Sequence, residues 1–397
     1  MKILHINNFH HIRGGSDSVY FNTAEVLSAE GHSSAYFAGQ HTLNKRNPYE
    51  SYFPLSVEAG SQKLSSLRRF LHNPDARRNI GALITDHGPF DLAHLHIYYG
   101  RLTASILKPL RDAGIPIIQT LHEYKLACPV YTMERAGQTC DACVSGSTLN
   151  LLRHRCKNGS LAHSAAMLAE FWSSRLQGDV RYIDRFICVS DFQLEVMRRA
   201  GLPEERLRRI HNFVEIENVE SSSLKSRGDY FLYFGRIEKL KGLPTLIQAV
   251  QASGHNLRIA GTGLWEADLC AVIDGVHNIE HLGFVSGKPL RQLIANARAV
   301  IVPSEWYENC PMSVLEAKAA GTPVIGARIG GIPELIRDGV DGLLFEAGNV
   351  DSLAEALLKF DDLDAISMGR AAREDAELRF SPEMHVVELL KIYNEVI

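Results

Sequence analysis

Two glutamates stand where a strand-like run passes into a helix-like run. The strand-like run ends at Val302, Glu308 lies in the following loop, and Glu316 falls in the first turns of a helix that we expect to begin near Met312. Exposed N–H groups at a helix start favour anionic or hydroxyl-rich ligands. The two carboxylates can accept hydrogen bonds from the hydroxyls of such a ligand. For Glu316, complementing the helix dipole is the alternative role.

Two cations follow another strand-like run, residues 230–234. The pair Gly235-Arg236 comes directly after the run, and Lys241 lies five residues beyond Arg236. Arginine offers a planar fork of donors and lysine a compact charge, and together they suit a diphosphate. Solvation at the surface is the alternative for either cation taken alone.

Four of the seven cysteines are clustered, namely Cys128, Cys140, Cys143 and Cys156. Four thiolates can hold a tetrahedral structural zinc, and free thiols are the alternative. An odd number of cysteines is typical of a reducing compartment. Cys188 stands in an apolar run and is expected to be buried.

The elements that must position these residues alternate between strand and helix, which predicts α/β architecture with two doubly wound, Rossmann-like parallel sheets. Expected strands cover residues 2–7, 32–38, 91–95, 116–121 and 185–189, then 230–234, 257–260, 279–282, 299–302, 323–325 and 342–345. The polar stretch 220–229 separates the two sets. We therefore expect an N-terminal domain over 1–212, with a cysteine-containing insertion at 123–160, and a C-terminal domain over 213–382. The last helix, 383–397, is expected to pack back on the first domain, and ligands to bind in a cleft where the domains face each other.

Length and composition agree with this plan. A chain of 397 residues exceeds what one core supports, and no apolar run approaches the roughly 20 residues of a membrane span. The first residues resemble a strand rather than a secretory leader, so a cytoplasmic protein is expected. Residues 1–200 carry a net charge of +5 and the remainder −9. The basic, leucine-containing stretch 63–78 indicates either a core-facing amphipathic helix or peripheral contact with the anionic inner face of a membrane.

Several motifs in order along the chain resemble the retaining glycosyltransferases of family 4. They are Glu308 with Glu316-Ala and Gly321-Thr-Pro-Val, Gly235-Arg236 with Lys241-Gly242, Gly14-Gly15, Thr120-Leu-His122-Glu, Gly261-Thr-Gly263, Leu282-Gly-Phe-Val285 and Gly330-Gly-Ile-Pro-Glu334. The resemblance covers essentially the whole chain. It implies the GT-B fold, with the acceptor on the N-terminal domain and a nucleotide-sugar on the C-terminal one.

The resemblance also implies roles for single residues. Glu316 should hold the donor ribose, and Glu308 the transferred sugar, helped by backbone N–H groups from Asn309 to Met312. Arg236 and Lys241 should bind the diphosphate and stabilise its leaving charge. His122 should lie near the donor sugar and phosphate. The backbone at Gly15 and Gly263 should contact the donor, and Phe284 and Val285 should lie against its base. The sequence departs from the family at Cys310 and Pro311, where proline removes one backbone donor.

The implied function is transfer of a sugar from a nucleotide-diphosphate donor to a glycan or lipid-linked acceptor, in surface polysaccharide or glycoconjugate assembly. No metal or other cofactor is expected to be needed for transfer, and no nucleic acid partner is expected. A nucleotide-sugar epimerase, a phosphorylase and a non-catalytic binding subunit of the same fold are alternatives. A nicotinamide-dependent oxidoreductase is disfavoured because the full glycine fingerprint is absent, and no acidic residue follows the second strand.

Overall fold

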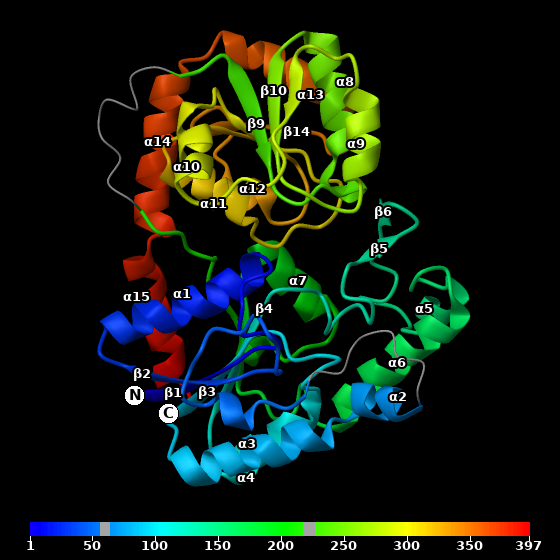
Figure 1. Cartoon of the computed structure of the whole chain (residues 1–397), viewed down its shortest axis with the longest axis vertical. Coiled ribbons are helices and arrows are strands. Elements are labelled where there is room, and N and C mark those ends of the chain that lie inside the picture. The colour runs from blue at the N-terminus through cyan, green and yellow to red at the C-terminus, as the bar shows by residue number, and fades with distance from the viewer. Residues whose placement is uncertain (56–63, 217–226) are drawn as a thin grey trace. The chain divides into compact units, whose positions relative to one another are not determined.

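The computed structural model describes residues 1–55, 64–216 and 227–397. These residues form two compact units (Figure 1). The N-terminal unit comprises Met1–Ala136, Cys140–His211 and Val386–Ile397, and the C-terminal unit comprises Gly137–Thr139 and Asn212–His385. Each contains a six-stranded parallel sheet with helices, so the predicted pair of doubly wound sheets is confirmed.

The sheet of the N-terminal unit has the strand order β2-β1-β3-β4-β7-β8. Its strands are β1 (Lys2–Ile6), β2 (Ser33–Phe37), β3 (Leu92–Leu95), β4 (Ile117–Leu121), β7 (Arg185–Cys188) and β8 (Leu207–Arg209). The central strands β3 and β4 are buried throughout. Strands covered on both faces need nearly continuous apolar runs, which explains why they were visible in the sequence.

The helices connecting these strands are α1 (Gly15–Ala29), α2 (Leu64–Leu71), α3 (Pro74–His87), α4 (Leu107–Asp112), α5 (Asn150–Arg153), α6 (Leu161–Leu176) and α7 (Asp191–Arg199). Two-residue strands β5 (Glu134–Arg135) and β6 (Gln138–Thr139) pair within the insertion. Helix ends follow local chemistry. The side chain of Asn73 caps α3 by accepting from the Ala76 N–H, and Pro74 takes the first helical position, where no N–H is needed.

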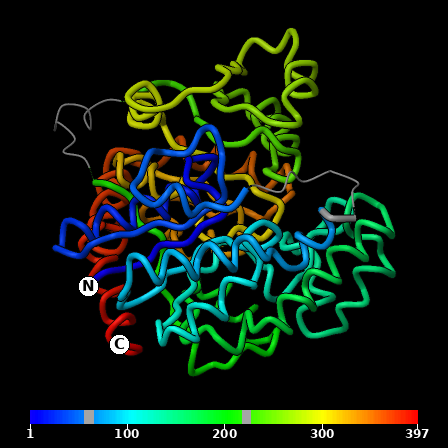
Figure 2. The backbone as a smooth tube through the Cα atoms, turned by 60° about the horizontal axis from the view of Figure 1, so that its bottom comes forward, coloured from blue at the N-terminus to red at the C-terminus, as the bar shows by residue number. Residues whose placement is uncertain are grey.

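The last helix, α15 (Pro382–Asn394), delivers the chain end to the N-terminal unit. Leu389, Ile392 and Tyr393 share one apolar cluster with Ile3, Leu92, Ile118 and Ile187 from the strands. Figure 2 shows the red chain end near the blue first strand. Segments from both ends of the sequence therefore build the core of this unit.

The C-terminal unit repeats the pattern with the strand order β11-β10-β9-β12-β13-β14. Its elements are β9 (Tyr230–Phe234), α8 (Leu243–Ser253), β10 (Asn256–Ala260), α9 (Glu266–Ile273), β11 (Ile279–His281), α10 (Gly287–Asn296), β12 (Val300–Val302), α11 (Met312–Ala319), β13 (Val324–Ala327), α12 (Ile332–Leu335), β14 (Gly342–Phe345), α13 (Val350–Asp361) and α14 (Ala365–Arg379). Helices α8 and α13 pack together, and their buried leucines join Phe231 and Ile259 of the sheet in one core.

The basic stretch noted in the sequence lies partly outside the described residues, since Lys63 is not among them. Helix α2 packs against α6, and the hydroxyl of Ser173 donates to the carbonyl of Leu71. Arg68 and Leu67 are exposed, whereas Arg69 is paired with Asp75 at 2.8 Å. Contact of this helix with a membrane stays a prediction. Among the described helices, none has the length and apolarity needed to cross a bilayer.

Candidate functional site

The turns after β9 and β12 lie against each other at the carboxyl edge of the C-terminal sheet. Gly242 makes this approach possible, because its φ is +75° and a Cβ there would lie 1.7 Å from the carbonyl oxygen of Pro303. Any other side chain would clash with backbone in a conformation that L residues rarely adopt. The contact places Lys241 beside the loop that carries Glu308.

Glu308 is anchored through one carboxylate oxygen. Its Oε1 accepts hydrogen bonds from Lys241 Nζ (2.6 Å), Ser304 Oγ (2.7 Å) and Trp306 Nε1 (2.8 Å). The side chains of Lys241 and Glu308 are only 17% and 11% exposed. Burial opposes ionisation of Glu308, but Lys241, Trp306 and Ser304 together outweigh it and lower its pKa. Glu308 is therefore a fixed anion at neutral pH.

Trp306 links the two predicted cations. Lys241 Nζ lies 4.8 Å from the centre of the indole ring, and the guanidinium carbon of Arg236 lies 5.9 Å from it. Arg236 is 59% exposed and forms an ion pair with Glu238 at 2.8 Å. The structure thus gathers Arg236, Lys241 and Glu308 around one aromatic ring.

The backbone of the Glu308 loop is held from beneath. The N–H of Gly331 donates to the carbonyl of Glu308 at 2.8 Å. Gly330 has a φ of +57°, and a Cβ at this position would lie 2.4 Å from the same carbonyl oxygen. Gly330-Gly331 therefore fixes the position of the loop backbone at Glu308, and with it the position of the carboxylate.

Glu316 lies on α11, whose first residue is Met312. Burial raises the pKa of Glu316 to about 7. Its carboxylate forms no hydrogen bond or ion pair with any residue in the described ranges. The structure therefore does not join Glu316 to Arg236, Lys241 or Glu308 by direct contact, and the carboxyl is buried without a partner among the described residues.

Helix α11 is anchored by a lysine that the sequence analysis missed. Lys318 is fully buried, and its Nζ lies 3.0 Å from Asp341 and 2.5 Å from Asp375. It also donates to the carbonyl of Leu335 at 2.6 Å. In a sequence, a lysine within a helical run is expected at the solvated surface. The role of Lys318 becomes clear only in the structure, because its aspartate partners are distant in the sequence.

Other residues that the sequence predicts to contact the nucleotide-sugar lie on turns of the same unit. Gly263 follows β10, and a Cβ there would lie 2.3 Å from the carbonyl oxygen of Ile237, so this turn packs on the turn after β9. Phe284 follows β11 and is 75% exposed, and Val285 is half-buried. Asn309 and Met312 bracket the start of α11, where Pro311 supplies no side-chain cap.

In the N-terminal unit, His122 follows β4 and is paired with a second histidine. Nδ1 of His96 lies 2.8 Å from Nε2 of His122, and the rings stack with centres 5.1 Å apart. Burial lowers the pKa of His122 to about 4. One ring must donate and the other accept, so the tautomers of the two neutral rings are coupled. The alternation His94-Leu95-His96 was a usable signal, because residues two apart in an extended run share a face.

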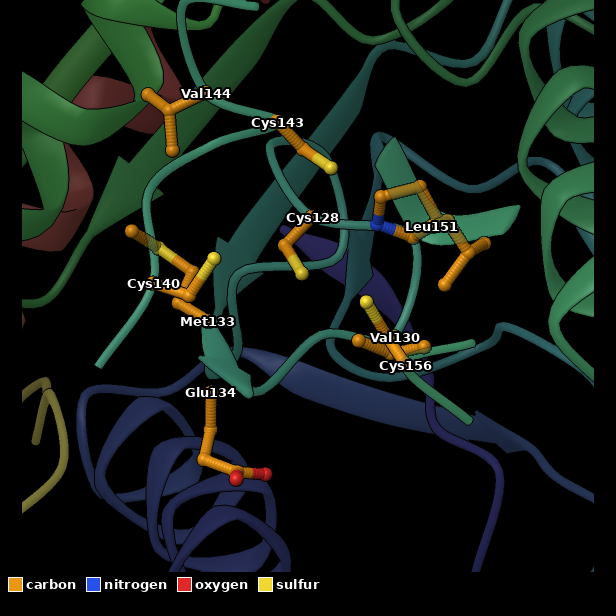
Figure 3. Close-up of a pocket in the computed structure, with 10 residues that line it drawn as sticks. Cys128, Val130, Met133, Glu134, Cys140, Cys143, Val144, Leu151 and Cys156 are labelled. Carbon is orange, nitrogen blue, oxygen red and sulfur yellow. The ribbon is translucent and has the colours of Figure 1, made fainter. Parts of the chain in front are cut away.

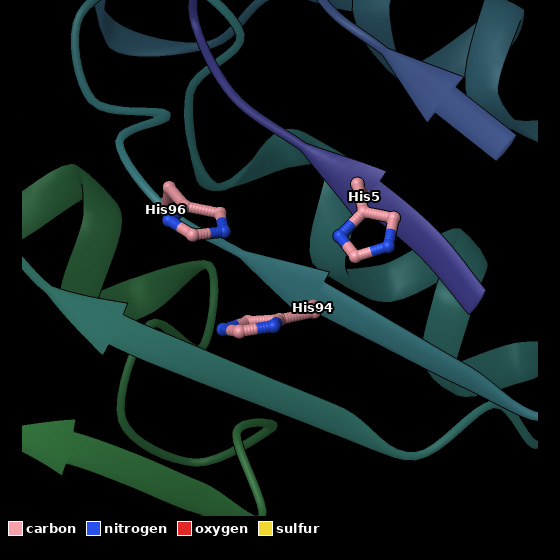
Figure 4. A group of neighbouring side chains, drawn as sticks. All are labelled: His5, His94 and His96. Atoms are coloured by element: carbon pink, nitrogen blue, oxygen red, sulfur yellow. The ribbon is translucent and has the colours of Figure 1, made fainter. Parts of the chain in front are cut away.

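The histidine stack continues from His96 to His94, and the tilted ring of His5 lies beside His94. Figure 4 shows the rings of His5, His94 and His96 together beside neighbouring strands, and nitrogens of the three lie within 4.8 Å of one another. His94 is hydrogen-bonded through both nitrogens, to Tyr393 at 2.6 Å and Thr120 at 2.7 Å. A cation here would displace one of those bonds. Burial lowers the pKa of His5 to about 3, which keeps its ring neutral.

Gly15 is the first residue of α1, and Gly14 before it is extended and provides no side-chain cap. The loop leading to this helix is held by Asp17, which accepts from the Arg13 N–H at 3.1 Å and from Asn7 Nδ2 at 2.9 Å. The predicted cysteines Cys128, Cys140, Cys143 and Cys156 line one cavity in the same unit. Cys188 is buried, as predicted.

Comparisons with known proteins extend over nearly the whole chain. Residues 13–218 match the family model described as Glycosyltransferase Family 4, and residues 214–375 match the model described as glycosyl transferases group 1. The chain is 35% identical over 181 residues to the D-inositol 3-phosphate glycosyltransferase of Corynebacterium glutamicum, a match covering 42% of this chain and 43% of that protein. It is 25% identical over 227 residues to the putative colanic acid biosynthesis glycosyltransferase WcaL of Escherichia coli, covering 53% and 56%. The chain spans about half the length of the curated relatives it matches.

Solved structures resemble the chain over its full length. The Anabaena HepE complex with UDP has a TM-score of 0.70 at 17% identity, and the lipopolysaccharide outer core galactosyltransferase WaaB has 0.67 at 17%, each covering 100% of both chains. At such identity the likeness concerns the fold. Because the first family model alone matches more than half of the sequence and the second continues it, the chain belongs to glycosyltransferase family 4.

Proposed function

We propose that this protein is a retaining glycosyltransferase that moves a sugar from a nucleotide-diphosphate donor to a glycan or lipid-linked acceptor. The C-terminal unit holds the donor and the N-terminal unit the acceptor. The observation that carries the proposal is the anchored anion Glu308, bonded to Lys241 and set beside Arg236 at the carboxyl edge of a parallel sheet. Ligands of such sheets bind at this edge.

The arrangement supports leaving-group stabilisation as the chemical role of the cations. Lys241 and Arg236 would neutralise charge that develops on the departing diphosphate, and preorganised donors of this kind supply a large part of catalysis. One oxygen of Glu308 already accepts three hydrogen bonds. The carboxylate is therefore better suited to accept hydrogen bonds from sugar hydroxyls than to act as a covalent nucleophile. The departing phosphate would help to deprotonate the acceptor, and transfer would pass through an oxocarbenium-like state with retention.

The names of similar proteins guide the choice of probes. HepE of Anabaena has been solved with UDP and with UDP-glucose. WcaL and WaaB are named for colanic acid and for the lipopolysaccharide outer core. Uridine nucleotides are therefore the first donors to test, and surface glycans the first acceptors. A cytoplasmic location, with or without contact at the inner face of a membrane, is part of the proposal.

A thermal-shift screen of the full chain tests donor binding. The panel contains UDP, GDP, ADP and TDP with UDP-glucose, UDP-N-acetylglucosamine and GDP-mannose. We expect one nucleoside diphosphate and a sugar derivative of it to raise the unfolding temperature of the C-terminal unit. A panel without any shift would contradict the proposal.

A second assay separates the alternatives. Release of free nucleoside diphosphate from the bound donor, slow alone and faster with added surface glycan, supports a transferase. Interconversion of the donor sugar without release indicates an epimerase, and binding without consumption indicates an inert subunit. Proton NMR of the product distinguishes retention from inversion at the anomeric carbon.

Glu316 gives a prediction with a defined pH dependence. Its pKa rises from 4.5 to about 7 in the folded chain, so burial of the charge lowers the free energy of unfolding progressively between these values and fully above pH 7. We expect Glu316→Gln without ligand to be more stable than the parent by about 1–3 kcal/mol at pH 8, with the difference vanishing towards pH 4.5. Denaturant titrations across this range measure the effect.

The same substitution should weaken donor binding at pH 8. Loss of hydrogen bonds from ribose hydroxyls to a carboxylate corresponds to roughly a 10- to 100-fold increase in the dissociation constant of the responding nucleotide-sugar. Glu355→Gln, at an exposed position of α13, is the matched control and should change neither quantity. His122 does not titrate in this window, since its pKa is about 4. Unchanged donor affinity in Glu316→Gln would remove the ribose assignment.

A further inference from the structure

The insertion that follows His122 brings four cysteines into one place. Cys128, Cys140, Cys143 and Cys156 all line a small cavity of about 10 Å³ within the N-terminal unit. Figure 3 shows the four side chains arranged around this space, with the carboxylate of Glu134 turned away from it. All four are free thiols rather than disulfides. The volume suits a single ion or water.

The surroundings of the thiols are apolar. Besides the cysteines, the cavity is lined by Glu134, Pro129, Val130, Met133, Val144 and Leu151, and the last four are buried apolar side chains. Because the Glu134 carboxylate points away from the sulfurs, the side chains that face them offer no oxygen ligand to a hard cation. This arrangement suits a soft cation that takes all of its ligands from thiolates.

The segment has little regular structure of its own to hold this geometry. Strands β5 and β6 have two residues each, and α5 has four. Tyr131, Met133 and Arg155 adopt positive φ angles of 60°, 49° and 49°, which L residues rarely adopt. Such backbone persists where surrounding interactions over-determine it. A cross-link joining residues 128 to 156 would provide that constraint.

We propose that Cys128, Cys140, Cys143 and Cys156 bind one structural zinc ion. Each thiol loses its proton to solvent on binding, and the sulfurs draw in to about 2.3 Å from the ion, with tetrahedral geometry. Four protein ligands leave no open position, so the ion organises the segment after His122 and takes no direct part in chemistry. The proposal is independent of the proposed transferase function.

Metal analysis of the full chain tests the site. The protein is produced with zinc, purified without a polyhistidine tag and kept reduced, and its metal content is measured by plasma mass spectrometry. We expect one zinc per chain, and loss of that zinc in Cys143→Ser. Cys270→Ser removes an exposed cysteine elsewhere and should retain the full amount. Equal loss of zinc in both variants would overturn the assignment.

Measurements on the unaltered protein cover the case in which Cys143→Ser does not fold. Stepwise titration with a mercurial should release zinc as four thiols react, and cobalt-substituted protein should show the strong sulfur-to-cobalt charge-transfer band. A folded protein free of zinc overturns the proposal. So does a disulfide between Cys140 and Cys143 in protein that was never exposed to oxidant, detected by mass spectrometry after alkylation.

Discussion

Replacing Lys241 with alanine is expected to slow sugar transfer roughly 30- to 1,000-fold, the loss that follows when one preorganised donor to a developing anion costs about 2–4 kcal/mol. Lys241 is 2.6 Å from Glu308 and close to the indole of Trp306, so its charge is held in place rather than solvated. Turnover with saturating donor and acceptor measures the effect. The expectation rests on the proposed function.

Lys239→Ala is the matched control, because Lys239 is exposed in the same short turn. It should transfer sugar at the parental rate. Removal of Lys241 also takes away the charge that offsets the burial of Glu308, so the pKa of Glu308 should rise and activity should fall further in acid. A parental rate in Lys241→Ala would show that this lysine does not contact the leaving group.

Lys318→Met is expected to lower the free energy of unfolding of the C-terminal unit by about 3–5 kcal/mol, because it leaves buried carboxylates without their shared partner. Lys318 lies 3.0 Å from Asp341 and 2.5 Å from Asp375, with no exposed side-chain surface. Methionine preserves most of the side-chain volume, so the loss reports on charge rather than on packing. Denaturant unfolding followed by circular dichroism measures it.

Lys359→Met, on the exposed face of α13, should leave stability unchanged. Hydrogen exchange locates the effect, since amides of α11 and α14 should lose protection before those of α8. In the double variant Lys318→Met with Asp375→Asn, part of the loss should be recovered because one uncompensated charge is gone. Arg337 lies 2.6 Å from Asp341 and Arg379 lies 3.2 Å from Asp375. A Lys318→Met protein as stable as the parent would mean that these two arginines neutralise the aspartates without the lysine.

The strands were predictable because each is a short apolar run set between polar turns. Residues 230–234 were expected as a strand and form β9, and residues 32–38 were expected where β2 covers Ser33–Phe37. The ends differ by a residue or two because they depend on hydrogen bonds of single terminal residues rather than on the apolar pattern. Helix α6 was missed, since it lies beyond the insertion and its apolar positions are interrupted by serine and glutamate.

The types of residue in the site were predictable from the sequence, but the contacts between these residues were not. Spacing identified Lys241 and Glu308 as candidates, yet their direct bond joins residues 67 apart and depends on how the turns after β9 and β12 meet. The hydrogen bonds from Ser304 and Trp306 to Glu308 were not predictable either, because they depend on the fold of the same loop. His96 escaped notice because a histidine in an apolar run is typical of a core. The face that it shares with His94 was the available signal, and the 2.8 Å contact with His122 identifies its partner.

The path of α15 limits where the protein can be truncated or recombined. Both ends of the polypeptide belong to the same unit, so cutting once after residue 211 would strip Leu389, Ile392 and Tyr393 from the apolar cluster around Ile3. The truncated product would present bare aliphatic surface and is expected to aggregate. Chimeras that exchange the C-terminal unit therefore need two junctions, the second of them inside a helix.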